Sequence, residues 1–147
     1  MAVIKYINLG SGQDIQRGDG WINYDIIPQE EIVQRLDVEK ENIPLGDNTI
    51  SYIKANDVLE HFVNLRHVLN ECHRVLSSEG VLHAEVPRFP HDDSVKDPTH
   101  VRFFIPETFK YFSDYKSACE MYGFKQWVRI MQEDREHRII VEMKPIK

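Results

Sequence analysis

The chain has 147 residues, of which 41% are hydrophobic and 29% are charged, and its formal net charge is −6. This length and balance predict one globular domain over residues 1–147 and exclude an intrinsically disordered chain. The negative charge and the lack of any basic run make nucleic acid an unlikely partner.

The chain shows no membrane or secretory pattern. No apolar segment approaches the ~20 residues of a membrane span, and residues 1–9 are short and already patterned as a strand. Cys72 and Cys119 have no metal-ligand spacing and lie on apolar helical faces, where a free thiol acts as a small hydrophobe. We therefore expect a cytoplasmic protein with no membrane association.

Four strands are predicted before the first helix. Residues 3–9 are mostly apolar, as in a strand covered on both faces. Residues 21–27 form a second strand that ends at Pro28, and residues 31–38 form a weaker third. A fourth strand, residues 50–55, follows the turn sequence PLGDNT.

Helical spacing of apolar residues predicts a helix over residues 65–76. Its predicted polar face holds Arg66, Asn70, Glu71, His73 and Arg74. A fifth strand, residues 81–86, stops at Pro87. Residues 88–105 then form a polar loop long enough to be functional.

The last part of the chain predicts a helical segment and a hairpin. Pro106 is favoured at the first position of a helix, a break is expected near Ser113, and Gly123 is a typical stop. Residues 125–131 and 138–143 alternate in polarity around a charged turn, as in an antiparallel hairpin. The order of elements predicts an α/β fold with a Rossmann-like, mostly parallel sheet and this hairpin at one edge.

Small and acidic residues follow the predicted strands, at the ends where such sheets bind ligands. Gly10 and Gly12 allow a tight turn and close approach to a ligand, although GxG alone is equally typical of a plain turn. Asp25 ends the second strand, where a carboxylate accepts both hydroxyls of a ribose. Asp37 ends the third strand and is placed to accept a hydrogen bond from an adenine amino group.

The connection between the first two strands is unusually short. Residues 13–20 cannot hold the full helix that normally follows a nucleotide-binding glycine turn. We therefore predict that the first helix is shortened or absent and that a loop covers a more open site.

Four passages stand in the order INLGSG, GWINYD, DVEKENIPLGDNTISYIKANDVLEHF and LNECHRVLSSEGVLHAEVP. Together they resemble the class I S-adenosylmethionine-dependent methyltransferases, particularly the small type 11 branch. The resemblance extends over residues 4–143. The sequence departs from the family pattern at Asn8, where an acid is common, at Asp14 in place of a third glycine, and at Ser51 in place of an aspartate.

The resemblance implies S-adenosylmethionine as cofactor and in-line methyl transfer to a small-molecule or glycan-type acceptor. The cofactor-binding residues that it implies are Asn8, Gly10, Ser11, Gly12, Asp25, Ile26, Asp37, Val38, Asn56 and Asp57. It also places His61, in the sequence VLEHF, on the cofactor side of the acceptor pocket.

His61 and His100 are the candidate catalytic residues, because oxygen and nitrogen acceptors can need a base. His83 lies inside a predicted strand and is less suited to this role, and His67, His73 and His137 are expected to be solvated. The loop sequence HDDSVKDPTH offers possible metal ligands in His91, Asp92, Asp93, Asp97 and His100. Its spacing fixes no coordination geometry and clustered loop aspartates are usually solvated, so no metal site is predicted.

Other functions stay open at this point. A nicotinamide-dependent dehydrogenase shares the glycine turn and the acid, but it needs a full first helix and a third glycine. A non-catalytic binding module, or a subunit that needs a partner, is compatible with the missing helix. A homo-oligomer is also compatible with a shallow site.

Acceptor recognition is expected from the polar loop. A pocket for a ring and an anion could be formed by Arg88, Phe89, Arg102, Phe103 and Phe104, or the phenylalanines could equally be core residues. Phe104 is expected to be a core residue that anchors the loop.

Overall fold

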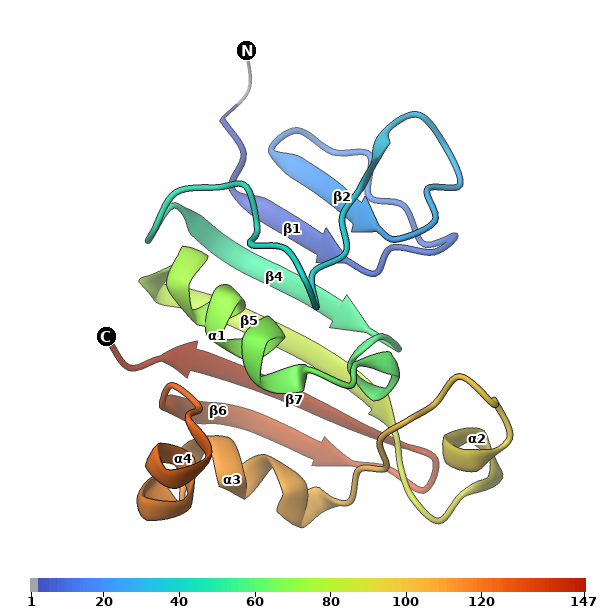
Figure 1. The fold of residues 1–147 in the computed structure, drawn as a ribbon, viewed down its shortest axis with the longest axis vertical. Helices are drawn as coiled ribbons and strands as arrows, with labels where there is room; N and C mark the ends of the chain where they lie inside the picture. Colours follow the sequence, from blue (N-terminus) through green and yellow to red (C-terminus); the bar gives the residue numbers. More distant parts are fainter. Residues whose placement is uncertain (1–2) are drawn as a thin grey trace.

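The computed structural model describes residues 3–147, and Met1 and Ala2, at the start of the predicted domain, lie outside this range. The described chain forms a seven-stranded sheet in the order β3-β2-β1-β4-β5-β7-β6 (Figure 1). The strands are β1 (Tyr6–Leu9), β2 (Trp21–Asp25), β3 (Val33–Arg35), β4 (Ile50–Asn56), β5 (Leu76–Pro87), β6 (Trp127–Asp134) and β7 (Arg138–Pro145). Neighbouring strands are parallel except for the two pairs made by β7. The predicted Rossmann-like sheet with its antiparallel hairpin is confirmed.

The helices are short apart from the first. They are α1 (Leu65–Val75), α2 (Asp92–Val95), α3 (Lys110–Ser113) and α4 (Lys116–Tyr122), with 3₁₀ turns η1 (Leu59–His61) and η2 (Pro106–Phe109). The predicted break falls after Ser113, and Gly123 ends α4 in the left-handed conformation with φ +77°. Within residues 3–147, no helix is both long and apolar enough to cross a bilayer.

Several strand boundaries differ from prediction. β2 ends at Asp25 because Ile26 and Ile27 leave the sheet and are about half to two-thirds exposed. β5 begins at Leu76, directly after α1, because Leu76 already pairs with Ile50 of β4. The strand pattern of residues 81–86 therefore marks only the central part of β5.

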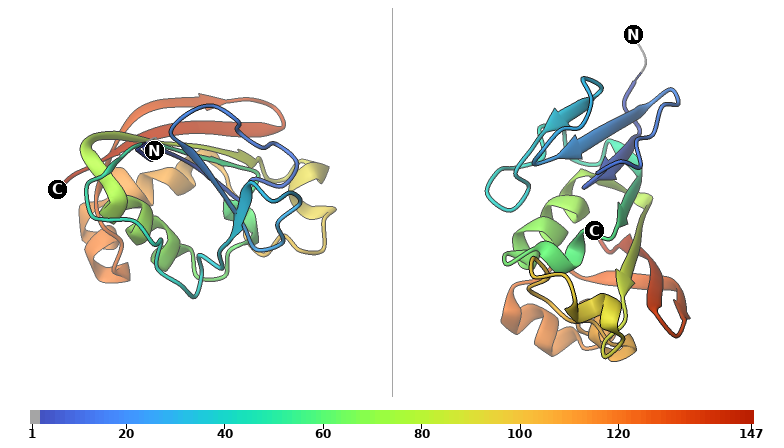
Figure 2. Two further views of the ribbon diagram at one scale, coloured as in Figure 1. Left: turned by 90° about the horizontal axis from the view of Figure 1, so that it is seen from above. Right: turned by 90° about the vertical axis from the view of Figure 1, so that its right-hand side faces the viewer.

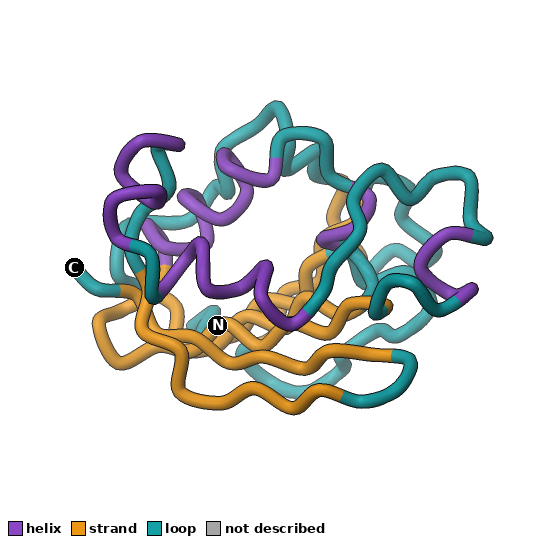
Figure 3. The backbone as a smooth tube through the Cα atoms, turned by 90° about the horizontal axis from the view of Figure 1, so that it is seen from below, coloured by secondary structure: helices purple, strands orange, loops and turns teal. Residues whose placement is uncertain are grey.

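The helices α1, α3 and α4 all pack against one face of the sheet (Figures 2 and 3). The inward side chains of the central strands, such as Ile7, Ile53 and Leu82, are fully buried there with Val68 and Cys72 of α1. This alternation gives the sheet one apolar face, and burial of that face is the main driving force for folding.

No helix of residues 3–147 covers the opposite face (Figure 2), but Ile7, Asn8 and Leu9 are all buried, so β1 is covered on both faces as expected. Tyr6, Trp21, Tyr52 and His83 form a row of ring contacts across this face, and all four are partly exposed. His83 also bonds Glu142 of β7 at 3.0 Å. Side chains with polar atoms are tolerated on this face of the strands because water partly reaches it.

Two residues of the predicted polar face of α1 are buried. Glu71 accepts a hydrogen bond from the Ile43 amide at 2.8 Å, and His73 Nε2 donates to the carbonyls of Gln126 and Ile146 at 3.1 and 3.0 Å. The expectation that His73 is solvated is wrong, because the connection before β4 and the C-terminal hairpin pack over this side of α1. Helical periodicity cannot reveal cover that comes from distant segments.

Candidate functional site

A cavity of about 510 Å³ opens at the carboxyl ends of β1, β2, β3 and β4. It is lined by Leu9, Gly10, Gly12, Tyr24, Asp25, Ile26, Ile27, Leu36, Asp37, Val38, Glu39, Asp57, Val58, His61, Phe62 and Thr99. Its size falls within the usual ~300–1,000 Å³ of small-molecule and cofactor sites. Its place, outside the strand ends of an open α/β sheet, is the place where such folds bind ligands.

The glycine turn after β1 forms one wall of the cavity. Gly10 has φ +64°, and a Cβ at this position would lie 2.2 Å from Val58 Cγ2, so only glycine fits between β1 and the segment after β4. Gly12 has φ +50° and faces open space. The two glycines therefore have different roles. Gly10 permits close packing of the turn against Val58, and Gly12 leaves space beside the cavity.

Asp25 holds the turn in place. Its Oδ2 accepts a hydrogen bond from the Gly12 amide at 2.8 Å and its Oδ1 accepts one from the Ile27 amide at 2.9 Å. Each carboxylate oxygen has a second lone pair, so both can accept another donor from a ligand. The carboxylate is thus oriented by the backbone and retains the capacity to bind a diol.

Seven of the ten predicted cofactor residues line this cavity, together with His61. They are Gly10, Gly12, Asp25, Ile26, Asp37, Val38 and Asp57. The other three lie outside its wall. Asn8 is 3% exposed and donates to the Asp14 carbonyl and to Asn23, while Ser11 Oγ and Asn56 Oδ1 are buried without hydrogen-bond partners in the described chain.

A loop replaces the first helix between β1 and β2, as predicted, and two asparagine side chains fix its backbone by hydrogen bonds. Asn8 and Asn23 are paired across β1 and β2, and both are buried on the face without helices. Asn23 accepts from the Gln16 amide and donates to the Gln16 carbonyl, each at 2.8 Å. Lys54 of β4 pairs with Asp14 at 2.5 Å. Side-chain amides thus satisfy the backbone groups that a helix would satisfy internally.

The other side of the cavity is built by η1 and the loop of residues 88–105. The Glu60 carbonyl accepts from the amides of Val101 and Arg102 at 2.9 and 3.2 Å. Arg102 also donates to the carbonyls of Phe62 and Val63, each at 2.6 Å. Arg102 therefore fastens the loop to the segment after η1, while it also lines a small hollow beside Phe103.

The aromatic residues of the loop separate into two groups. Phe104 is 1% exposed in the core, as expected, and stacks on Phe109. Phe89 and Phe103 are 40% and 53% exposed, and their ring centroids are 5.7 Å apart. The loop thus presents one exposed aromatic pair.

Glu60 is a residue of this region that the sequence patterns did not single out. It is 2% exposed, and neither carboxylate oxygen has a hydrogen-bond partner within residues 3–147. Burial raises the pKa of Glu60 to about 7. The only sequence signal is that apolar residues flank the pair Glu60–His61 in VLEHF, where an exposed acid would be unusual.

The two candidate catalytic histidines lie beside Glu60 and contact each other, with ring centroids 4.8 Å apart. The His61 side chain is 34% exposed and lines the cavity. The His100 side chain is 7% exposed, lies behind His61, and bonds the Ser94 carbonyl through Nδ1 at 3.0 Å. His61 is therefore the histidine that faces a bound molecule.

The five possible metal ligands of the loop do not gather at one point. His91 and Asp93 lie near His137 of the β6–β7 turn, whereas His100 lies with Glu60 and His61. Asp97 Oδ2 is 3.6 Å from His100 Nε2. The ends of the loop are joined, with the Phe89 amide donating to the Phe104 carbonyl at 2.8 Å, but His91 and His100 belong to two separate clusters.

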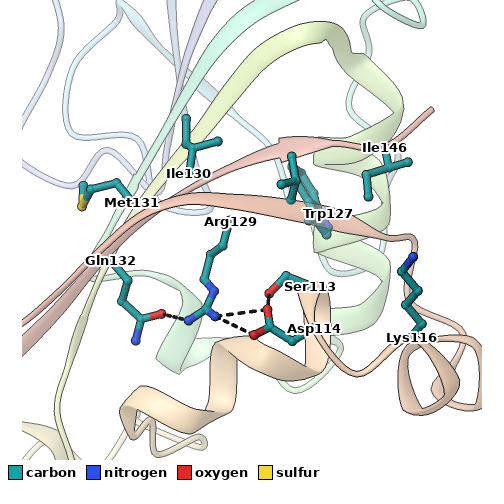
Figure 4. A pocket seen from close by; sticks show the side chains of 10 residues that line it. Ser113, Asp114, Lys116, Trp127, Arg129, Ile130, Met131, Gln132 and Ile146 are labelled. Atoms are coloured by element: carbon teal, nitrogen blue, oxygen red, sulfur yellow. Dashed lines mark hydrogen bonds and ion pairs between the residues drawn. The ribbon is translucent and has the colours of Figure 1, made fainter.

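A second hollow of about 600 Å³ lies between α3 and the outer strand β6. Figure 4 shows Arg129 reaching from β6 toward Asp114 and Gln132 there. The Arg129 Nη groups bond Asp114 and Gln132, and this hollow lies away from the strand ends that carry the predicted site. It is therefore a groove in the surface rather than the candidate cofactor site.

Comparison with known proteins agrees with this geometry. A methyltransferase domain family, type 11, matches residues 23–84. No curated protein matches the chain. The match runs from within β2 to within β5 and includes Asp25, Asp37 and His61. It favours methyl transfer over the nicotinamide-dependent alternative.

Solved structures share the fold at low sequence identity. YcgJ from Bacillus subtilis is 12% identical with a TM-score of 0.68, and the match covers 99% of this chain and 93% of that one. An S-adenosylmethionine-dependent methyltransferase from Archaeoglobus fulgidus is 16% identical with a TM-score of 0.67, covering 97% and 86%. The Burkholderia thailandensis 1,6-didemethyltoxoflavin-N1-methyltransferase, solved with its substrate and S-adenosylhomocysteine, is 11% identical with a TM-score of 0.63, covering 99% and 72%.

The cavity fits the cofactor that this family uses. A backbone-oriented carboxylate stands at the end of β2, and a glycine turn with open space beside Gly12 stands at the end of β1. The domain match over residues 23–84, the strand order and this cavity together support a class I, type 11-like methyltransferase that uses S-adenosylmethionine.

Proposed function

We propose that the cavity at the ends of β1–β4 binds S-adenosylmethionine and that the protein methylates a small-molecule or glycan-type acceptor. The observation that carries this proposal is the position of the Asp25 carboxylate at the cavity wall. Two backbone amides orient it, and each of its oxygens can accept a further hydrogen bond. In this assignment Asp25 binds the ribose hydroxyls, and Asp37 with Val38 borders the adenine. Gly12 and Asp57 lie along the ribose and the methionine portion.

When bound, the cofactor supplies a methyl group already activated by a positively charged sulfur. The protein then has to hold an acceptor in line with that group and to exclude competing water. His61 and Thr99 stand on the cavity wall nearest the polar loop, so we assign the acceptor side to them, with His100 and Glu60 in support. Asp57, with φ +53°, is held there by Arg138 at 2.7 Å and borders the same side.

The surface around the cavity supports a small acceptor. The exposed pair Phe89 and Phe103 lies on the same loop as Thr99 and is suited to pack against a sugar or aromatic ring. The loop is too short to form a cap domain, so a small acceptor or the end of a glycan chain fits better than a folded protein. The net charge of −6 argues against nucleic acid.

The test has a binding stage and a turnover stage. Isothermal titration should show one site for S-adenosylhomocysteine and none for NAD. Sugars, small phenols and amines are then screened for release of S-adenosylhomocysteine, and His61→Ala should lower turnover with an active acceptor by ~10²-fold, the usual scale of acid–base contributions. The matched control is His137→Ala, on the exposed turn between β6 and β7. Tighter binding of NAD than of S-adenosylhomocysteine would refute the proposed cofactor, and full turnover by His61→Ala would refute the acceptor side.

A further inference from the structure

We propose that Glu60, His61 and His100 form a binding site for a divalent transition-metal ion, with zinc as the first candidate, at the entrance of the cofactor cavity. One ligand atom from each of the three side chains lies within 4.8 Å of the other two. Glu60 Oε1 is 4.0 Å from His61 Nε2 and 3.9 Å from His100 Nε2. The three groups come from η1 and from the loop 40 residues later in the chain.

The hydrogen-bond network assigns the same tautomer to both histidines. His100 Nδ1 is 3.0 Å from the Ser94 carbonyl, which can only accept, so Nδ1 carries the proton. Thr99 Oγ1 donates its single proton to Asp97 Oδ1 at 2.7 Å and therefore accepts from His61 Nδ1 at 3.0 Å. In both neutral rings the unprotonated Nε2 is left facing Glu60.

With Glu60 ionised, this arrangement brings three electron-pair donors together without a proton donor between them. The Glu60 side chain is 2% exposed, and its two oxygens have no hydrogen-bond partner within the described residues. A buried carboxylate without a partner costs several kcal/mol, and two nearby lone pairs add to that cost. A cation at the centre would satisfy all three groups at once.

The surroundings resemble those of metal-binding histidines in general. Such histidines nearly always donate their second ring N–H to a carbonyl or a carboxylate-linked group, which fixes ring and tautomer. Ser94 does this for His100, and the Thr99–Asp97 pair does it for His61. The amides of Val101 and Arg102 clamp the loop to the Glu60 carbonyl and so hold His100 in register with η1.

The distances allow a metal after a small contraction. Zinc–nitrogen and zinc–oxygen bonds of about 2.1 Å place tetrahedral ligand atoms about 3.4 Å apart. The present separations exceed this by roughly 1.5 Å at most. Rotation of the partly exposed His61 ring is enough to close much of that difference.

The ligand set indicates the kind of metal. Two imidazoles and one carboxylate suit zinc and its first-row neighbours, and catalytic zinc sites keep a fourth position for water or substrate. His61 and Thr99 line the cavity, so the free position faces the acceptor side. There the ion would bind and polarise an acceptor oxygen, and His61 and His100 would act as its ligands, in place of the acid–base role used above for His61. This role rests on the proposed function, whereas metal binding itself does not.

The test measures metal content and affinity directly. The purified protein is treated with a chelator and titrated with Zn²⁺ by calorimetry and with Co²⁺ by visible absorption. We expect one ion per chain and a tetrahedral or five-coordinate cobalt spectrum. Glu60→Gln should abolish this binding, and Thr99→Val, which removes only the support of His61, should weaken it by ~10–100-fold. The matched control is His137→Ala, which disrupts the other cluster, His91, Asp93 and His137, and should leave binding unchanged.

Three results would overturn the proposal: no binding of either ion to the folded wild-type protein, retention of the cobalt spectrum in Glu60→Gln, or its loss in His137→Ala. If Glu60→Gln does not fold, Thr99→Val and His100→Ala decide the matter by the same spectrum. Titration with S-adenosylhomocysteine in the presence of chelator separates this proposal from the proposed function. Binding of S-adenosylhomocysteine without binding of a metal ion refutes only the metal site. Binding of a metal ion without binding of S-adenosylhomocysteine refutes only the assigned cofactor.

Discussion

Asp25 and Gly12 are joined by a hydrogen bond of 2.8 Å from the glycine amide to the carboxylate, which ties the turn after β1 to the end of β2. One side chain therefore shapes the wall of the cavity and, in the proposed function, offers lone pairs to the ligand. Because the Ile27 amide engages the other oxygen, the carboxylate stays oriented without a ligand.

Replacing Asp25 by Ala should weaken S-adenosylhomocysteine binding by ~1.5–3 kcal/mol, the range for hydrogen bonds to a charged group. The loss includes some loosening of the turn, because the Gly12 amide loses its acceptor. Calorimetry measures the affinity, and circular dichroism checks the fold. The matched control is Asp19→Ala, an exposed acid of the same connection, which should bind normally. Unchanged affinity in folded Asp25→Ala would remove this residue from the site.

Gly10→Ala should be much more harmful to stability than Gly12→Ala. Both positions have positive φ, which costs an alanine about 1–2 kcal/mol, but only the new Cβ at Gly10 meets Val58, at 2.2 Å. Overpacking adds about 1–3 kcal/mol there. Urea unfolding of the two variants measures the difference. Equal losses would show that Val58 moves aside without cost.

Asn23→Ala should release the loop that replaces the first helix. Asn23 bonds the amide and the carbonyl of Gln16 and accepts from Asn8, so its removal leaves buried polar groups unpaired at about 1–3 kcal/mol. Hydrogen exchange of the Gln16 amide should become faster. Gln13→Ala, an exposed change in the same loop, is the control. Slow exchange at Gln16 in Asn23→Ala would mean that something else holds the loop.

The stability of the protein should fall in acid partly because of Glu71. Burial by itself raises the pKa of this carboxyl, but the hydrogen bonds from Arg74 and the Ile43 amide outweigh it and hold the pKa below the ordinary 4.5. A carboxyl with a lowered folded-state pKa contributes stability above its unfolded pKa, and this is lost as the pH falls through the folded value.

Glu71→Gln should therefore reduce the slope of stability against pH below about 4.5, the ordinary pKa of the carboxyl. Urea unfolding at several pH values measures this slope. Glu79→Gln is the control, because its ion pair with Lys144 lies on an 84% exposed side chain and contributes little. An unchanged slope in Glu71→Gln would contradict the assigned cause.

Local patterns in the sequence predicted most of the elements and one side of the site. Strand alternation, helical spacing over α1 and the stop at Gly123 depend only on residues close to the element that they predict. The glycine turn and Asp25 follow two consecutive parallel strands, and parallel strands bring their ends to one edge of the sheet. The count of residues between β1 and β2 was enough to predict that no full helix fits there.

Only the tertiary structure decided which side chains are buried by segments far along the chain. Glu71 and His73 looked polar and solvated because helical spacing shows only the contacts of the helix with one layer. Arg102 looked free to bind an anion, but the loop brings it back to the carbonyls after η1. The grouping of Glu60 with His61 and His100 depends on the same return, which joins positions 40 residues apart. Contacts between residues so far apart in the sequence arise from tertiary packing, so no local sequence pattern predicts them.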